Sequence, residues 1–200
     1  MIMSSSGFTI FETAIGPCGI AWGERGLLAT QLPGYGERDT RSWLTRRRPD
    51  LEEAAVPPPG VQDAIERIAA HLRGEDSDLD GIALDMNGLP ALNRKVYEIA
   101  RAIPSGHTRT YGEIANEVGE LGDARAVGQA LGQNPFPIVI PCHRVLAANG
   151  KAGGFSAPGH ITTKFKLLEI EGARIEDAKA NGTPTLFDVP LSVAPPRRRR

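Results

Sequence analysis

The chain has 200 residues, of which 40% are hydrophobic and 24% charged, a composition that suits one large or two small globular domains. The net charge of −1 confines any nucleic-acid contact to a local basic surface. Cys18 and Cys142 exclude a disulfide framework and lack zinc-ligand spacing, so we expect no metal and no cofactor. Free thiols, with neither a membrane-spanning run nor a secretory signal, favour the cytoplasm.

The first 88 residues alternate short apolar segments with turn residues and then show helical periodicity. The expected elements are antiparallel strands over 8–14, 19–22 and 27–32, helices over 42–48 and 61–73, and a returning edge strand over 79–84. Gly74 ends the second helix. This order predicts a small α/β domain over residues 1–88.

The second half has a helical pattern. The expected helices are 93–103, 110–118, 123–133 and 163–171. Thr110 and Glu113 have the spacing of a capping box, and Asp123 is a suitable N-cap for the next helix. Two short helices joined by a Gly-containing turn have the outline of a helix-turn-helix, although many hairpins that bind nothing look the same.

The helix over 123–133 has two unlike faces. One face is apolar, and the other holds Arg125, Gly128, Gln129 and Gly132 at helical spacing. Each glycine costs about 1 kcal/mol relative to alanine in a helix interior. Close approach to the wall of a groove would justify that cost, and a poorly formed surface helix is the alternative.

The segment Pro141-Cys-His-Arg-Val145 is the strongest chemical signal in the chain. A thiol becomes nucleophilic as a thiolate, and cationic neighbours such as His143 and Arg144 lower its pKa. A small buried hydrophobe is the alternative for Cys142. Because neighbouring residues of an extended segment point to opposite sides, His143 can act on Cys142 only across a sharp turn or through a water.

Glu171 is placed where a carboxylate is disfavoured. It lies in the last turn of the helix over 163–171, whose inward residues are expected to be Phe165, Leu168 and Ile161. The negative end of the helix dipole disfavours the carboxylate by roughly 0.3–1 kcal/mol. Orienting a histidine would justify that cost, whereas a solvated surface glutamate is the alternative.

Three other polar residues have structural alternatives as well. Tyr111 lies in an apolar stripe, which favours a core position, but its place in a first helical turn leaves the hydroxyl free for a ligand. Arg125 could be a solvated charge. Asn134 precedes Pro135, which excludes helical geometry there and suggests a turn-bracing side chain.

Six motifs occur together in one order. They are Tyr111-Gly-Glu-Ile-Ala115, Arg125-Ala-Val-Gly128, Asn134-Pro135, Ile140-Pro-Cys-His-Arg-Val145, Gly153-Gly-Phe-Ser156 and Leu167-Leu-Glu-Ile-Glu-Gly172. In this the chain resembles the O6-alkylguanine-DNA alkyltransferases, also called methylated-DNA–protein-cysteine methyltransferases. The resemblance is close over residues 92–173 and looser over 8–88.

The resemblance implies a fold and a domain order. It implies an α/β ribonuclease-H-like domain over 1–88 and a mainly α, winged-helix-like domain with a helix-turn-helix over 89–175. The Pro-rich segment over 176–200 ends in four arginines, and we expect it to be a disordered basic tail that adds salt-dependent DNA affinity. The protein is expected to act as a monomer, with no membrane and no obligate protein partner.

The implied activity is direct-reversal DNA repair. Cys142 would take the alkyl group from O6-alkylguanine, or from O4-alkylthymine, in double-stranded DNA after the base is flipped out. His143 would accept the thiol proton through a water, and Glu171 would polarise His143. Tyr111 would help to rotate the nucleotide and would protonate N3 of the leaving guanine. Because nothing regenerates the thiol, each molecule would act once.

The remaining implied contacts concern DNA and the base. Arg125 would fill the space left by the flipped base, and the helix face would lie in the minor groove. The DNA-binding residues implied are Arg125, Ala126, Gly128, Gln129 and Gly132, and those around the base are Asn134, Val145, Phe155 and Ser156.

Two features depart from the family pattern. Phe155 stands where many members have tyrosine, so a hydroxyl contact to the base is missing, and the segment over 156–160 is longer than in several relatives. A protein that binds alkylated DNA and recruits other repair factors without transfer is the alternative. A Cys-His hydrolase is disfavoured, because such enzymes bring the two residues from distant segments.

Overall fold

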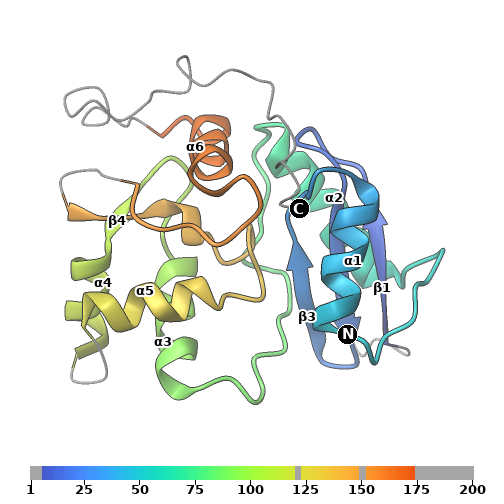
Figure 1. Ribbon diagram of the computed structural model, residues 1–200, viewed down its shortest axis with the longest axis horizontal. Helices are drawn as coiled ribbons and strands as arrows, with labels where there is room; N and C mark the ends of the chain where they lie inside the picture. The colour runs from blue at the N-terminus through green and yellow to red at the C-terminus, as the bar shows by residue number, and fades with distance from the viewer. Residues whose placement is uncertain (1–5, 120–122, 149–151, 174–200) are drawn as a thin grey trace, which may run out of the picture.

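A computed structural model describes residues 6–119, 123–148 and 152–173. The expected basic tail over 176–200 lies outside the described residues. The described chain combines a small antiparallel sheet with helices, and no helix in it is long and apolar enough to cross a membrane. Figure 1 shows the sheet with α1 and α2 on one side of the molecule and α3, α4 and α5 on the other.

The sheet contains three antiparallel strands in the order of the sequence. They are β1 (Gly7–Phe11), β2 (Cys18–Gly23) and β3 (Gly26–Gln31). All three predicted strands are confirmed, but β1 ends three residues early. The Thr13 hydroxyl donates to the Gly16 carbonyl oxygen at 2.6 Å and accepts from the Ile15 amide, so the chain turns before Ala14 can join the strand.

Two helices complete the N-terminal half, α1 (Glu37–Arg47) and α2 (Pro59–Leu72). Helix α1 begins five residues earlier than predicted, and its buried Leu44 packs on the sheet with Phe8, Ala21 and Ala29. Helix α2 agrees with the prediction, and Gly74 follows it in the left-handed conformation with φ 79°.

The predicted edge strand over 79–84 is wrong. Only one bridge, between Leu27 and Leu84, pairs this segment with the sheet. The Arg101 guanidinium donates to the carbonyl oxygens of Leu79, Asp80 and Ile82 at 2.9, 2.8 and 2.7 Å. An arginine side chain therefore satisfies carbonyl groups that a neighbouring strand would otherwise bind.

Four helices make up most of the C-terminal half. They are α3 (Ala91–Arg101), α4 (Tyr111–Val118), α5 (Ala124–Gly132) and α6 (His160–Ile170). The predicted caps are confirmed: Thr110 and Glu113 form a reciprocal capping box, and the Asp123 carboxylate accepts from two amides of α5. Phe165 and Leu168 are buried, but Ile161 is 43% exposed, because α6 begins at His160 and its first turn faces outward.

A short parallel strand pair was not predicted. Strand β4 (Arg109–Thr110) pairs with β5 (Val145–Leu146). Strand β4 leads directly into α4, while β5 directly follows the 3-10 turn η2 (Cys142–Arg144). The pair therefore brings Tyr111 and Cys142 together, although they are far apart in the sequence.

The two halves share one hydrophobic core. Ile20 and Leu32 from the sheet segment belong to the same buried cluster as Ile138 and Val139. Thr30 adds polar contacts across the junction, since its hydroxyl donates to the Pro137 carbonyl oxygen at 2.7 Å. The N-terminal half thus supports the segment that precedes Cys142.

Candidate functional site

Cys142 begins the 3-10 turn η2, so the chain turns sharply at Pro141 and Cys142. Its amide donates to the Ile140 carbonyl oxygen at 2.8 Å, and the residue is half-buried. Of the two geometries open to the sequence, the structure therefore contains the sharp turn. A water between Cys142 and His143 remains compatible with it.

The segment before Cys142 is a strained turn rather than a strand. Ile138 has φ 78°, a left-handed conformation that a β-branched residue rarely adopts. The buried Asn134 braces the turn, as predicted: its amide nitrogen donates to the Ile140 carbonyl oxygen at 2.9 Å and its oxygen accepts from the Phe136 amide at 2.9 Å.

Cys142 lines a cavity of about 690 Å³ between α4, α5 and the segment before α6. Most of the predicted site residues also line it, namely Tyr111, Arg125, Gly128, Gln129, Gly132, Phe155 and Ser156. The cavity is large enough for a small organic group such as a nucleobase. The structure therefore brings the thiol, the tyrosine and the glycine-bearing helix face around one space.

Tyr111 lies in the cavity wall rather than in the core. Its hydroxyl donates to the Gly154 carbonyl oxygen at 3.3 Å, and burial raises its pKa. A Cβ atom at Gly153 would lie 2.8 Å from the Tyr111 ring, and Gly153 has φ +63°. Glycine at position 153 is thus required for Tyr111 to hold this position.

The glycines of α5 are not required by the packing of the described chain. A Cβ atom at Gly132 would meet nothing within 4 Å, and one at Gly128 would make only ordinary contact with Tyr111 at 3.8 Å. Arg125 and Gln129 are exposed on this face, while Ala126 is half-buried and its amide donates to Asp123. The backbone of this face is accessible at its two glycines, as expected for a surface that another molecule approaches closely.

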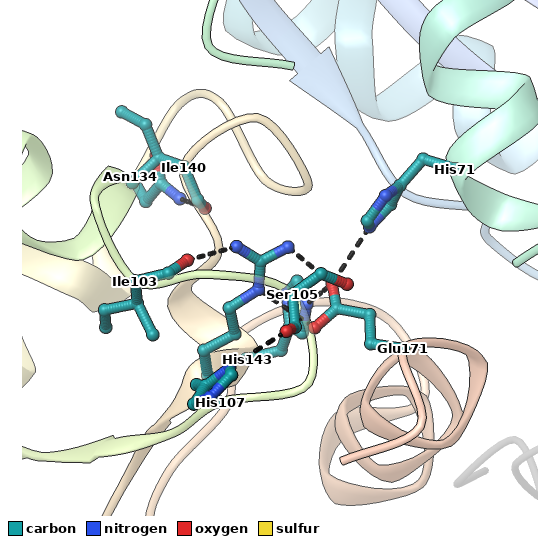
Figure 2. Close-up of polar contacts among 9 residues, drawn as sticks. His71, Ile103, Ser105, His107, Asn134, Ile140, His143 and Glu171 are labelled. Carbon is teal, nitrogen blue, oxygen red and sulfur yellow. Dashed lines mark hydrogen bonds and ion pairs between the residues drawn. The ribbon is translucent and has the colours of Figure 1, made fainter. Parts of the chain in front are cut away.

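The Glu171 carboxylate accepts hydrogen bonds from three side chains. Its Oε1 accepts from His143 Nε2 at 2.8 Å, His71 Nε2 at 2.9 Å and Arg144 Nη2 at 2.9 Å, while Oε2 accepts from Arg144 Nε at 2.9 Å. The Glu171 side chain is only 1% exposed. Figure 2 shows Glu171 between His143 and His71, which come from different parts of the chain.

These donors decide the charge of Glu171. Hydrogen bonds from His143, His71 and Arg144 lower its pKa far below the ordinary value, against the opposing effect of burial. The carboxylate therefore stays ionised despite the helix dipole. The solvated surface glutamate that the sequence left open is wrong for Glu171, whereas Glu169 is exposed.

The contact with Glu171 also fixes the tautomer of His143. Because a carboxylate only accepts, His143 Nε2 must carry the hydrogen, and Nδ1 of the neutral ring is left as a base. His143 is fully buried, and Nδ1 has no hydrogen-bond partner among the described protein atoms. Burial is the main cause that lowers the pKa of His143, so the ring is neutral near pH 7.

The cationic neighbour of the thiol is not the one that the sequence suggested. Arg144 pairs with Glu171 and donates to the Ile103 carbonyl oxygen. The charge that favours the thiolate comes from Lys164, together with Asn134 and backbone amides. Burial outweighs them and raises the pKa of Cys142, so the expectation of a lowered pKa is wrong for the protein without substrate.

Sequence reasoning missed Lys164. It is fully buried on α6, and its ammonium group donates to the carbonyl oxygens of Val145 and Ala152 at 2.6 and 2.5 Å. It lies 5.8 Å from the centre of the Tyr111 ring, and burial lowers its pKa to about 8. Its spacing with Leu167 and Leu168 was the available signal, because the three share an inward helix face.

Three residues expected around the base occupy different environments. Phe155 is half-buried against the core and lines the cavity. Ser156 is exposed, and its hydroxyl donates to the Gly132 carbonyl oxygen at 3.1 Å. Val145 is fully buried in β5 and is not among the residues that line the cavity, and its carbonyl oxygen accepts from Lys164.

The other cysteine is chemically unlike Cys142. Cys18 is buried in β2, and burial raises its pKa to about 12. Within the described ranges, no group of three or more His, Cys, Asp or Glu side chains is arranged to hold a metal ion.

Comparisons with known proteins agree with this site. Residues 91–173 match the family described as 6-O-methylguanine DNA methyltransferase, DNA binding domain. The methylated-DNA–protein-cysteine methyltransferase of Mycobacterium tuberculosis is 42% identical over 134 residues, which are 66% of this chain and 76% of the relative. That of Methanothermobacter thermautotrophicus is 35% identical over 79% of this chain and 81% of the relative.

Solved structures extend the similarity to the whole described fold. Mycobacterium tuberculosis OGT in complex with DNA matches with a TM-score of 0.66 at 33% identity, over 91% of this chain and 99% of that chain. The O6-methylguanine-DNA methyltransferase of Pyrococcus kodakaraensis matches with a TM-score of 0.64 at 27% identity, over 83% and 99%. This chain therefore belongs to the methylated-DNA–protein-cysteine methyltransferase family, whose activity is direct-reversal repair by alkyl transfer from DNA to a cysteine of the protein.

Proposed function

We propose that Cys142 is the alkyl acceptor and that the substrate is O6-alkylguanine in double-stranded DNA. The single observation that carries this is the cavity in which the Cys142 thiol, the Tyr111 hydroxyl and the open face of α5 meet. The sulfur attacks the alkyl carbon in line with the bond to O6. A C–S bond forms, the C–O bond breaks, and its electron pair passes to the guanine.

His143 is proposed as the base that takes the thiol proton. Its Nε2–H is held by Glu171, so Nδ1 is free to accept a proton from Cys142 through a water. A base is needed because burial keeps the thiol protonated. The imidazolium that forms is stabilised by Glu171, which stays ionised.

Tyr111 is proposed as the proton donor to N3 of the leaving guanine. Burial raises the pKa of its hydroxyl, so the group retains a proton to give until guanine becomes basic. The proton that His143 holds balances the one that Tyr111 gives. Lys164 acts electrostatically, because its charge below the Tyr111 ring favours the thiolate before attack.

We propose that α4 and α5 form a helix-turn-helix whose second helix enters the minor groove. The open face of Arg125, Gly128, Gln129 and Gly132 permits close contact with DNA, and Arg125 fills the space left by the flipped base. Ala126 is proposed at the edge of this face, where its backbone approaches a phosphate.

The guanine is proposed to sit against Phe155 and Ser156. The Phe155 ring supplies stacking but no hydroxyl, and the exposed Ser156 side chain supplies a polar contact at the rim. Main-chain groups of Cys142 bind the base edge, with Asn134 holding the turn that presents them, whereas the carbonyl oxygen of Val145 already accepts from Lys164. The long segment over 156–160 sets the size of alkyl group that fits.

We also propose the type of each domain and the cellular compartment of the protein. The three-stranded sheet covered by α1 supports a ribonuclease-H-like domain over 1–88, and α3 to α6 support a winged-helix-like domain over 89–175. A free thiol that must remain reduced is compatible with the cytoplasm. Binding of alkylated DNA without transfer is the alternative that the first experiment below tests.

The first prediction concerns the acceptor. When the protein is incubated with duplex DNA containing O6-methylguanine, its intact mass should rise by one methylene, and peptide mapping should place the group on Cys142. Cys142→Ser should show no gain, whereas the matched Cys18→Ser variant should gain as the wild type does. Binding of the DNA without a mass change would support a lesion-binding protein and contradict transfer.

The second prediction concerns the glycine face. Gly132→Leu should not destabilise the fold and should raise the free energy of unfolding by up to about 1 kcal/mol, because leucine favours a helix more than glycine and its side chain projects into open space. The same change should weaken DNA binding about tenfold or more by blocking the groove contact. Gln62→Leu adds an identical exposed side chain on α2 and should bind normally. Equal affinities for both variants would refute the proposed interface.

The third prediction concerns Lys164. Lys164→Met removes a charge that lowers the pKa of Cys142, so that pKa should rise. Alkylation of Cys142 by iodoacetamide should then require higher pH, as followed by peptide mass spectrometry. Lys166→Met changes an exposed lysine on the same helix and serves as the control. A pH profile identical to that of the wild type would exclude the electrostatic role.

A further inference from the structure

His71 is a buried histidine of the N-terminal half that contacts the relay directly. It lies at the end of α2, one hundred positions from Glu171 in the sequence, and is 6% exposed. Its Nε2 lies 2.9 Å from Glu171 Oε1, the same oxygen that accepts from His143 at 2.8 Å. Figure 2 shows both histidines near the Glu171 carboxylate; His71 belongs to α2 and His143 to the turn η2.

We propose that His71 is a positioning residue for alkyl transfer, which couples the N-terminal half to the proton relay by holding the Glu171 carboxylate. This inference rests on the proposed function of Cys142 and His143. It assigns to α2 a part in the chemistry that goes beyond packing.

The geometry supports this role. Arg144 grips both oxygens of Glu171 from one side, through Nε at 2.9 Å and Nη2 at 2.9 Å. His143 and His71 both donate to Oε1 of Glu171. The second hydrogen bond, from His71, restricts rotation of the carboxylate away from the position in which it accepts from His143. Because Glu171 lies at the C-terminal end of α6, the helix beyond it offers no further support.

His71 also bears on the basicity of His143. Burial is the largest effect that lowers the pKa of His143; Arg144 and a protonated His71 lower it further, whereas Glu171 raises it. The neutral ring is the form that accepts a proton, so transfer is present above the pKa of His143 and is lost as pH falls through it. Removing His71 should raise that pKa and shift the acid limb of the rate profile to higher pH.

The surroundings of His71 contain other charges that the experiment must hold constant. His71 borders a second cavity of about 450 Å³, which shares no lining residue with the cavity at the thiol. The charged residues that line it besides Glu171 are Glu75, Asp76, Asp78, Asp80, Arg101 and Arg144. None of these is changed in the variants below.

The test is the single-turnover rate of methyl transfer, measured against pH in the full-length protein with O6-methylguanine duplex DNA. His71→Phe keeps a ring but removes the donor, and transfer at pH 7 should slow about tenfold, with the acid limb moved to higher pH. His71→Gln restores an N–H donor and should recover most of the rate. Thr40→Val removes a buried hydroxyl of the N-terminal half, which donates to the Pro17 carbonyl oxygen, and should leave rate and pH profile unchanged.

Each outcome decides the matter. Wild-type rate and profile in folded His71→Phe would overturn the role of His71, as would equal slowing in His71→Phe and Thr40→Val, because that pattern indicates a structural effect. Should phenylalanine prevent folding, His71→Ala removes the donor without an apolar ring and is judged by the same criteria. Failure of the wild type to methylate Cys142 would instead contradict the proposed function.

Discussion

The hydrogen-bonded carboxylate of Glu171 is the interaction on which the site depends. One buried anion at the end of α6 accepts hydrogen bonds from α2 and from the turn η2, and Arg144 ties the cluster to the Ile103 carbonyl oxygen. Removing one member of a buried ion pair typically costs about 3–5 kcal/mol, because the remaining charge is left without a partner. The cluster therefore orients His143 and also fixes the turn that carries Cys142.

In the proposed mechanism, the Cys142 thiol stays protonated until His143 accepts its proton. Burial raises the pKa of Cys142, while Asn134 and Lys164 oppose that effect. Burial also lowers the pKa of His143, which keeps a neutral base next to a protonated thiol. Such a pair limits loss of the thiol to stray electrophiles, a relevant constraint for a protein whose acceptor is consumed. Burial is the main cause that raises the pKa of Cys18 to about 12, so this thiol stays protonated and unreactive.

Features with a local cause were predictable from the sequence. The capping box at Thr110, the Asp123 cap and the three strands follow from neighbouring residue types, and the structure confirms each of them. The helix dipole indicated that Glu171 could orient a histidine but left a solvated glutamate open, and the resemblance to a known family paired it with His143. The cavity residues followed from the resemblance to a known family, which spacing alone would not have supplied.

Features that depend on distant contacts were not predictable. The two-residue strands β4 and β5 carry no periodicity, and they pair only because the C-terminal half folds two segments that are distant in the sequence against each other. The segment over 79–84 has strand-like composition, but Arg101 binds its carbonyl oxygens. Arg144 was expected to lower the pKa of the Cys142 thiol, but it pairs with Glu171. The charge that lowers this pKa belongs to Lys164, which lies on α6.

The central claim is that Glu171 acts through His143 on Cys142. The pH dependence of single-turnover transfer by Glu171→Gln tests it most directly, with Glu169→Gln as the exposed control on the same helix. Loss of the carboxylate removes the main influences that raise the pKa of His143, so a weaker base should result. We predict a maximal rate lower by about tenfold to a hundredfold, an acid limb moved to lower pH, and retained DNA binding. A maximal rate and pH profile equal to those of the wild type and of Glu169→Gln would contradict the account.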